Sequence, residues 1–122
     1  MTVGKTALVV EAEFLIALDL QRMLEAAGYT ETMLARDAHE VEALLGRRSD
    51  VELALVELRL GDEGAYACIT DLRRRGIAVI CVTSDYEIST GKAGLGGLPV
   101  LTKPVSEEMF SSALHALAHA ED

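Results

Sequence analysis

The feature that most constrains the fold of this chain is a repeated alternation of short apolar runs with amphipathic segments. Strands are predicted for residues 5–11, 31–35, 52–58, 77–83 and 98–102. Helical spacing of apolar residues predicts helices for residues 14–29, 38–48, 65–76 and 106–120. Strands that alternate with helices form a parallel sheet with helices on both faces. We therefore expect one doubly wound α/β domain over residues 1–122.

The segment between the fourth and fifth predicted strands is the weakest part of this pattern. A helix belongs there, but "SDYEISTGKAGLGG" (residues 84–97) has its glycines in its second half. Glycine costs about 1 kcal/mol relative to alanine at an interior helix position. We expect a short or frayed helix followed by a mobile loop.

The first and second predicted helices have assignable core faces. In the first helix the residues expected to face the core, before a stop at Gly28, are Ile16, Leu20, Met23, Leu24 and Ala27. Off that face lie Phe14, Leu15, Ala17 and Leu18. Apolar residues on more than one side predict either a partner or dimer surface, or partial shielding by the last helix. In the second helix we expect Val41, Leu44 and Leu45 to point inward.

Charge and hydropathy exclude several classes of partner. The formal net charge is −9, which argues against a nucleic-acid surface. The basic cluster Arg73–Arg75 is expected at a helix C-terminus, where cations interact favourably with the helix dipole. No apolar run reaches the roughly 18 residues of a membrane span, and the start of the chain lacks a secretory signal. We therefore expect a cytoplasmic domain with no membrane partner.

The cysteines and histidines give no complete site. Cys68 and Cys81 have no metal-ligand spacing and are expected to be buried free thiols. His115 and His119 share a face of the last helix, but two histidines make an incomplete metal site, and an exposed polar face is favoured. His39 is expected to be exposed at a helix start.

Polar residues gather where the predicted strands end. They are Glu11 and Glu13, Glu57, Thr83 with Ser84, and Lys103. In a parallel sheet these ends meet at one edge. Carboxylates bind Mg²⁺, a lysine offsets phosphate charge and a hydroxyl can donate to a phosphoryl oxygen. The pattern indicates chemistry of phosphate and Mg²⁺, whereas the absence of a Walker A loop and of GxGxxG gives no support to a nucleotide site of those kinds.

The sequence resembles the receiver domains of bacterial two-component response regulators, the CheY-like family, over essentially its whole length. The segments that carry the resemblance are "ALVVEAEFLIALDLQRMLEAAGY", "LALVELRL", "RRRGIAVICVTS" and "LPVLTKPVSEE". The most specific match is Lys103-Pro104, since the family has a lysine and a proline there, joined by a cis peptide. Thr83 matches the hydroxyl residue that ends the fourth strand, and Glu11 matches the first of two adjacent acids. The resemblance implies a flavodoxin-like (βα)5 fold with strand order 2-1-3-4-5, and a signalling module rather than an enzyme.

Three positions depart from the family's pattern. The second acid of the pair is an aspartate in the family, and this chain has Ala12. The family's phosphate acceptor is an aspartate, and this chain has Glu57. The aromatic residue three positions before the lysine is replaced by Val100.

These departures predict loss of the family's chemistry. In the family the second acid and the acceptor both touch Mg²⁺, which requires near-octahedral ligands at ~2.0–2.1 Å. Ala12 removes one ligand, and Glu57 is longer by one methylene. A misplacement of about 1 Å can cost roughly 100-fold in rate. We therefore expect no cofactor, with the Mg²⁺ site and phosphorylation both lost.

Two functional hypotheses follow from the resemblance. In the first, the domain is a phosphorylation-independent pseudo-receiver that binds a protein, which is a histidine kinase, a response regulator or its own copy. Glu57 then pairs with Lys103, either as a partial mimic of the phosphorylated state or as a vestigial acid. In the alternative, the domain is an active receiver that accepts a phosphoryl group on Glu57. Its Mg²⁺ ligands would then come from Glu11, Glu13, Asp62 or Glu63.

Overall fold

The computed structural model describes residues 4–89 and 97–118, which form a five-stranded sheet with helices on both sides. The strands are β1 (Lys5–Val10), β2 (Tyr29–Ala35), β3 (Val51–Glu57), β4 (Ala78–Thr83) and β5 (Val100–Thr102). They are all parallel and lie in the order β2-β1-β3-β4-β5. This is the predicted flavodoxin-like topology.

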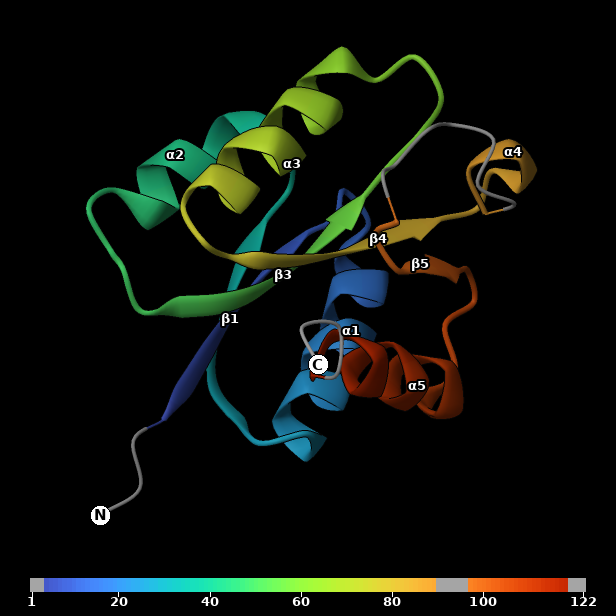
Figure 1. Cartoon of the computed structure of the whole chain (residues 1–122), viewed down its shortest axis with the longest axis horizontal. Helices are drawn as coiled ribbons and strands as arrows, with labels where there is room; N and C mark the ends of the chain where they lie inside the picture. The colour runs from blue at the N-terminus through green and yellow to red at the C-terminus, as the bar shows by residue number, and fades with distance from the viewer. Residues whose placement is uncertain (1–3, 90–96, 119–122) are drawn as a thin grey trace.

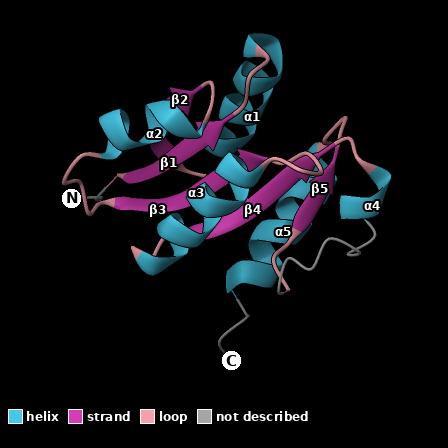
Figure 2. Cartoon of the chain, turned by 90° about the horizontal axis from the view of Figure 1, so that it is seen from above, coloured by secondary structure: helices cyan, strands magenta, loops and turns pink. Residues whose placement is uncertain are grey.

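Helices cover both faces of the sheet (Figure 1). They are α1 (Phe14–Ala26), α2 (Ala38–Leu45), α3 (Glu63–Arg74), α4 (Tyr86–Ser89) and α5 (Glu107–Ala118). Figure 1 shows α2 and α3 on one face and α1 with α5 on the other. The short helix α4 lies beside the β5 edge, as the view from above also shows (Figure 2).

Each face of the sheet has its own apolar core, and β3 contributes to both. Leu53 and Leu55 pack on the side of α1 and α5, whereas Ala54 and Val56 pack on the side of α2 and α3. A strand buried on both faces has no polar alternation, which is why β3 appears in the sequence as a continuous apolar run. Glu57, the last residue of β3, follows this buried run and so lies at the carboxyl edge of the sheet.

The helix ends follow from local sequence. Gly28 and Gly76 have φ angles of 102° and 82° just beyond α1 and α3, a backbone region that favours glycine. Ser106 caps α5 as predicted, because its Oγ accepts the Met109 N–H at 3.1 Å. Helix α2 ends at Leu45, earlier than predicted, since Gly46 turns the chain with a φ of 48°.

Two assignments of core faces are wrong. Ala17, placed off the core face, is only 3% exposed, and Ala27, placed in the core, is exposed. The buried stripe of α1 is Ala17, Leu20 and Leu24, so the helix is rotated relative to the predicted face. On α2, Leu44 is exposed because Val41 and Leu45, four residues apart, already face the core.

Other predictions have mixed outcomes. Helix α4 is short, as expected, while the predicted loop after it falls largely in residues 90–96, outside the described part of the chain.

Both cysteines are free, but only Cys81 is fully buried, and burial raises the pKa of its thiol to about 11. His39 and His115 are exposed, and His119 lies outside the described residues. Within the described ranges, none of the helices combines the length and apolarity needed to cross a bilayer.

Candidate functional site at the carboxyl edge of the sheet

The centre of the site is a lysine held between two carboxylates. Lys103 Nζ lies 2.7 Å from Glu11 Oε1 and 2.6 Å from Glu57 Oε2. The exposed fraction of the side chain is 11% for Lys103, 0% for Glu11 and 13% for Glu57. The predicted pairing of Glu57 with Lys103 is therefore confirmed, and Glu11 shares the same ammonium group.

Strand register brings these three residues together. Val10 pairs with Val56, so Glu11 and Glu57 leave neighbouring strands at the same height. Thr83 pairs with Thr102, and the Lys103 N–H donates to the Thr83 carbonyl at 2.8 Å. The peptide bond between Lys103 and Pro104 is cis, as the resemblance implied.

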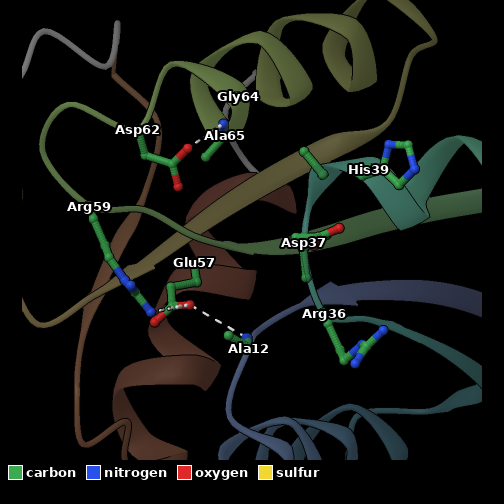
Figure 3. Close-up of a pocket in the computed structure, with 11 residues that line it drawn as sticks. Ala12, Arg36, Asp37, His39, Glu57, Arg59, Asp62, Gly64 and Ala65 are labelled. Carbon is green, nitrogen blue, oxygen red and sulfur yellow. Dashed lines mark hydrogen bonds and ion pairs between the residues drawn. The ribbon is translucent and has the colours of Figure 1, made fainter.

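The remaining carboxylate oxygens of Glu11 and Glu57 also have partners. Glu11 Oε2 accepts the Glu13 N–H at 3.1 Å. Glu57 Oε1 lies 3.5 Å from both Ala12 N and Arg59 Nη2. Figure 3 shows Glu57 pointing toward Ala12, with the Arg59 side chain reaching over it. Hydrogen bonds thus reach three of the four oxygens, whereas the buried Glu11 Oε1 has no hydrogen-bond partner and is held by its ion pair with Lys103.

Burial and charge act in opposite directions at the site. Burial raises the pKa of Glu11 above its ordinary value, against the attraction of the Lys103 ammonium and the hydrogen bond from the Glu13 backbone. Burial also acts to raise the pKa of Glu57, but the hydrogen bond and charge of Lys103, with Arg59, outweigh it and lower that pKa. For Lys103, burial acts to lower the pKa, and its bonds and charge interactions with the two acids raise it. Glu57 and Lys103 are therefore an ionised pair at neutral pH.

Thr83 is buried and its hydroxyl is already committed. Its Oγ1 donates to the Leu58 carbonyl at 2.8 Å and accepts the Asp85 N–H at 2.9 Å. Asp85 Oδ2 in turn accepts the Leu60 N–H at 3.1 Å. The residue predicted to contact a phosphoryl oxygen thus ties the loop after β3 to the start of α4.

The other predicted site residues lie around this centre. Ser84 and Pro104 are exposed beside Thr83 and Lys103. Val100, at the aromatic position, is half-buried and packs against the core on the α2 and α3 face. Asp62 caps α3, because its Oδ1 accepts the Ala65 N–H at 3.0 Å, and Glu63 is the first residue of that helix.

A cavity of about 320 Å³ opens next to Glu57. Its lining includes Ala12, Arg59 and Asp62, together with Asp37 and His39 at the start of α2 (Figure 3). Ala12 adds a methyl group and no carboxylate to this lining. An acid at position 12 would therefore add a carboxylate to the wall of this cavity, next to Glu57.

Two participants were not predicted from the sequence. Arg59 follows Glu57 by two residues and pairs with it across a turn, which no spacing rule requires. Asp85 lies two residues after Thr83 and just before α4. An aspartate at this position often caps a helix, so the sequence did offer a reason to single it out. Its side chain instead bonds the Leu60 N–H of the neighbouring loop.

Comparison with solved structures identifies the fold. The chain is similar to a signal receiver domain of an HD domain-containing protein from Pseudomonas fluorescens Pf-5, with 23% identity, 98% of each chain covered and a TM-score of 0.75. A CheY-like response regulator receiver domain from Methylobacillus flagellatus shows 18% identity over 94% of this chain and 99% of that chain, also with a TM-score of 0.75. No family model and no curated protein sequence matches this chain.

A third similar structure is a larger protein. The anti-anti-sigma factor PhyR from Bartonella quintana is 25% identical, with a TM-score of 0.76. The match covers 99% of this chain but 51% of PhyR, so this chain spans about half the length of that protein. The chain has the receiver fold of CheY-like response regulators, which confirms the resemblance seen in its sequence.

Proposed function

We propose that this domain is a phosphorylation-independent pseudo-receiver that signals by binding a protein partner. The receiver fold supports a signalling role. The observation that carries the finer proposal is the position of Lys103 Nζ, within 2.7 Å of both Glu11 and Glu57. A cation that belongs to the chain itself occupies the space between the acids that remain.

The two acids that contact Lys103 are balanced by cations of this chain. Glu11 and Glu57 bring two carboxylates, and Lys103 with Arg59 brings two cations, while the exposed Glu13 adds a further carboxylate nearby. Ala12 lacks the second acid of the family's pair, and so it avoids the repulsion that one more carboxylate would exert on Glu11 and Glu57. The substitutions at positions 12 and 57 are therefore consistent with one electrostatic arrangement.

This arrangement does not fit Mg²⁺. Carboxylate oxygens of Glu11, Glu13 and Glu57 lie within 4.8 Å of one another. Such oxygens are the type of ligand that Mg²⁺ prefers. Yet Glu11 and Glu57 each already bind the Lys103 ammonium, so a metal ion would compete with this cation for the same two carboxylates. Mg²⁺ also sheds its water reluctantly and demands near-ideal octahedral geometry. We infer that the domain works without a metal cofactor.

Phosphoryl transfer to Glu57 is opposed by the same contacts. Transfer depends on positioning and on charge stabilisation by metal and lysine. Glu57 Oε2 is bound to Lys103, and Arg59 reaches over Oε1 at 3.5 Å. The Thr83 hydroxyl donates to Leu58 and not toward the carboxylate. Neither Thr83 nor Lys103 can therefore receive a phosphoryl oxygen without giving up one of these contacts.

A protein is the partner that the surface favours. The net charge of −9 opposes nucleic acid, and Phe14 and Leu15 are 65% and 76% exposed at the start of α1, next to the site. PhyR, which contains a domain of this fold, is described as an anti-anti-sigma factor and a response regulator. We propose that the partner here is a histidine kinase, a response regulator or a second copy of the chain.

Intact-mass measurement with Mg²⁺ and a small phosphodonor tests this proposal. The protein should gain no phosphoryl group. The variant Ala12→Asp with Glu57→Asp, which restores both acids, should gain one and serves as the control for the assay. A phosphoryl gain by the unmodified chain, lost in Glu57→Gln, would show instead an active receiver with Glu57 as acceptor.

A further inference from the structure

We infer that the outer face of α1 binds the same face of a second copy of this chain, with the two helices antiparallel. The inference rests on the proposed function, in which the domain acts through protein contact, and it selects one of the partners. It uses none of the residues of the Lys103 site. Its basis is the order of residues along the outer side of α1, where Leu18 is half-buried and the others are exposed.

The outer face of α1 is unusually apolar at one end. Ala17, Leu20 and Leu24 face the core, so helical geometry places on the opposite side a row consisting of Leu15, Leu18, Asp19, Arg22 and Ala26. Leu15 is 76% exposed, and the adjacent Phe14 is 65% exposed. Large apolar side chains this exposed favour a surface that is covered in the working protein.

This row is complementary to itself when reversed. If two α1 helices cross antiparallel with their centres between Leu20 and Gln21, Leu15 of each copy lies opposite Ala26 of the other. A large side chain then meets a small one at both ends, which lets the helices approach closely. A two-fold symmetric contact requires such a self-complementary surface.

The charges in the middle of the row select the antiparallel arrangement. In the same register, Asp19 of each copy lies opposite Arg22 of the other. Within one chain these two side chains are 3.9 Å apart and remain 67% and 80% exposed, so each is accessible to a second partner. Parallel helices in register would instead bring like charges together, which disfavours that arrangement. Complementary charge thus points to a second copy as the occupant of this face.

Sedimentation of the full chain, from about 10 µM to about 1 mM and without Mg²⁺ or phosphodonor, tests the inference. The average mass should rise from monomer toward dimer as the concentration increases. Arg22→Asp places an acid opposite Asp19 in both of the symmetry-related contacts and should weaken association by at least about tenfold. Asp19→Arg combined with Arg22→Asp restores opposite charges and should restore association. Arg47→Asp, which makes the same charge change at an exposed site after α2, should have no effect.

Each outcome decides the matter. A chain that stays monomeric at the highest concentration overturns the inference. So does a dimer that Arg22→Asp leaves intact, because another surface must then hold it. Failure of the double exchange to rescue the single variant also overturns the Asp19 and Arg22 pairing. Circular dichroism verifies that each surface variant is folded, and the phosphodonor assay is independent, so either proposal can fail alone.

Discussion

Two cations are each held between two carboxylates at opposite edges of the same sheet. At the carboxyl edge Lys103 lies between Glu11 and Glu57, at 2.7 and 2.6 Å. At the amino edge Arg48 lies between Glu31 and Asp50, at 2.8 and 2.6 Å. The distances are nearly equal, but the surroundings differ.

Burial separates the two clusters. The Arg48 side chain is 32% exposed and its partners about half exposed, whereas Lys103 is 11% exposed and Glu11 is fully buried. At the amino edge the hydrogen bonds of Arg48 lower the pKa of Glu31. At the carboxyl edge burial outweighs the lysine and raises the pKa of Glu11. Similar ion-pair distances are therefore found in a partly exposed cluster at one edge and in a buried cluster at the other.

Removing the buried cation should have the largest effect. Lys103→Met leaves Glu11 and Glu57 close together without their shared partner. Breaking a buried pair in this way costs about 3–5 kcal/mol. Urea denaturation at neutral pH should show this loss, and a loss below about 1 kcal/mol would mean that the two acids do not depend on Lys103.

The cost of Lys103→Met should depend on pH. In the unmodified chain the pKa of Glu57 is lowered, so its contribution is present above 4.5 and is lost as pH falls through the lower folded value. The pKa of Lys103 is raised, so its contribution is present below 10.5 and is lost as pH rises through the higher folded value. Without Lys103 both acids take up protons more readily. The stability difference should therefore shrink between about pH 7 and about pH 5, and a constant difference would contradict this electrostatic account.

An intermediate effect is expected at Thr83. Thr83→Val removes the hydroxyl that joins the Leu58 carbonyl to the Asp85 N–H and leaves these buried or half-buried groups unpaired. The expected loss is about 1–3 kcal/mol by denaturation. Thr102→Val is the matched control, because Thr102 pairs with Thr83 in the sheet but is exposed. Equal losses in the two variants would show that the hydroxyl contacts of Thr83 carry no special weight.

Removing the partly exposed cation, Arg48, should have the smallest effect. Arg48→Met deletes contacts that water replaces readily, so its cost in urea should be less than about a fifth of that for Lys103→Met. Added salt should reduce this small cost further, because exposed pairs are screened. If Arg48→Met destabilises the chain as much as Lys103→Met, burial is not what distinguishes the two edges.

Much of the architecture was predictable because it depends on period and topology. The five strands, their parallel arrangement and the short α4 follow from apolar runs, their alternation with helices and glycine content, whereas the order of the strands came from the resemblance to receiver domains. The phase of α1 was not predictable, since apolar residues surround that helix and give several equivalent core faces; this is why Ala17 was misplaced. Helix α2 was predicted too long because the turn at Gly46 depends on a positive φ that the sequence only permits.

The site was predictable where it depends on strand ends. Glu11, Glu57 and Lys103 converge because parallel strands end at one edge, and the length of Glu57 allowed its pairing with Lys103 to be foreseen. Arg59 and Asp85 lie in turns, where side-chain direction depends on local backbone geometry. From the sequence, the Thr83 hydroxyl was expected to contact a phosphoryl oxygen. The structure shows that it donates to the Leu58 carbonyl.

The most direct test of the central proposal is a titration with Mg²⁺ and beryllofluoride, a phosphoryl mimic, followed by the amide NMR shifts of Glu57, Thr83 and Lys103. The Ala12→Asp and Glu57→Asp double variant provides the positive control. A pseudo-receiver whose acids are neutralised by Lys103 should show no shift at millimolar Mg²⁺, while the double variant responds. Saturable shifts at these residues in the unmodified chain would mean that Glu57 accepts a phosphoryl-like ligand and would contradict the proposal.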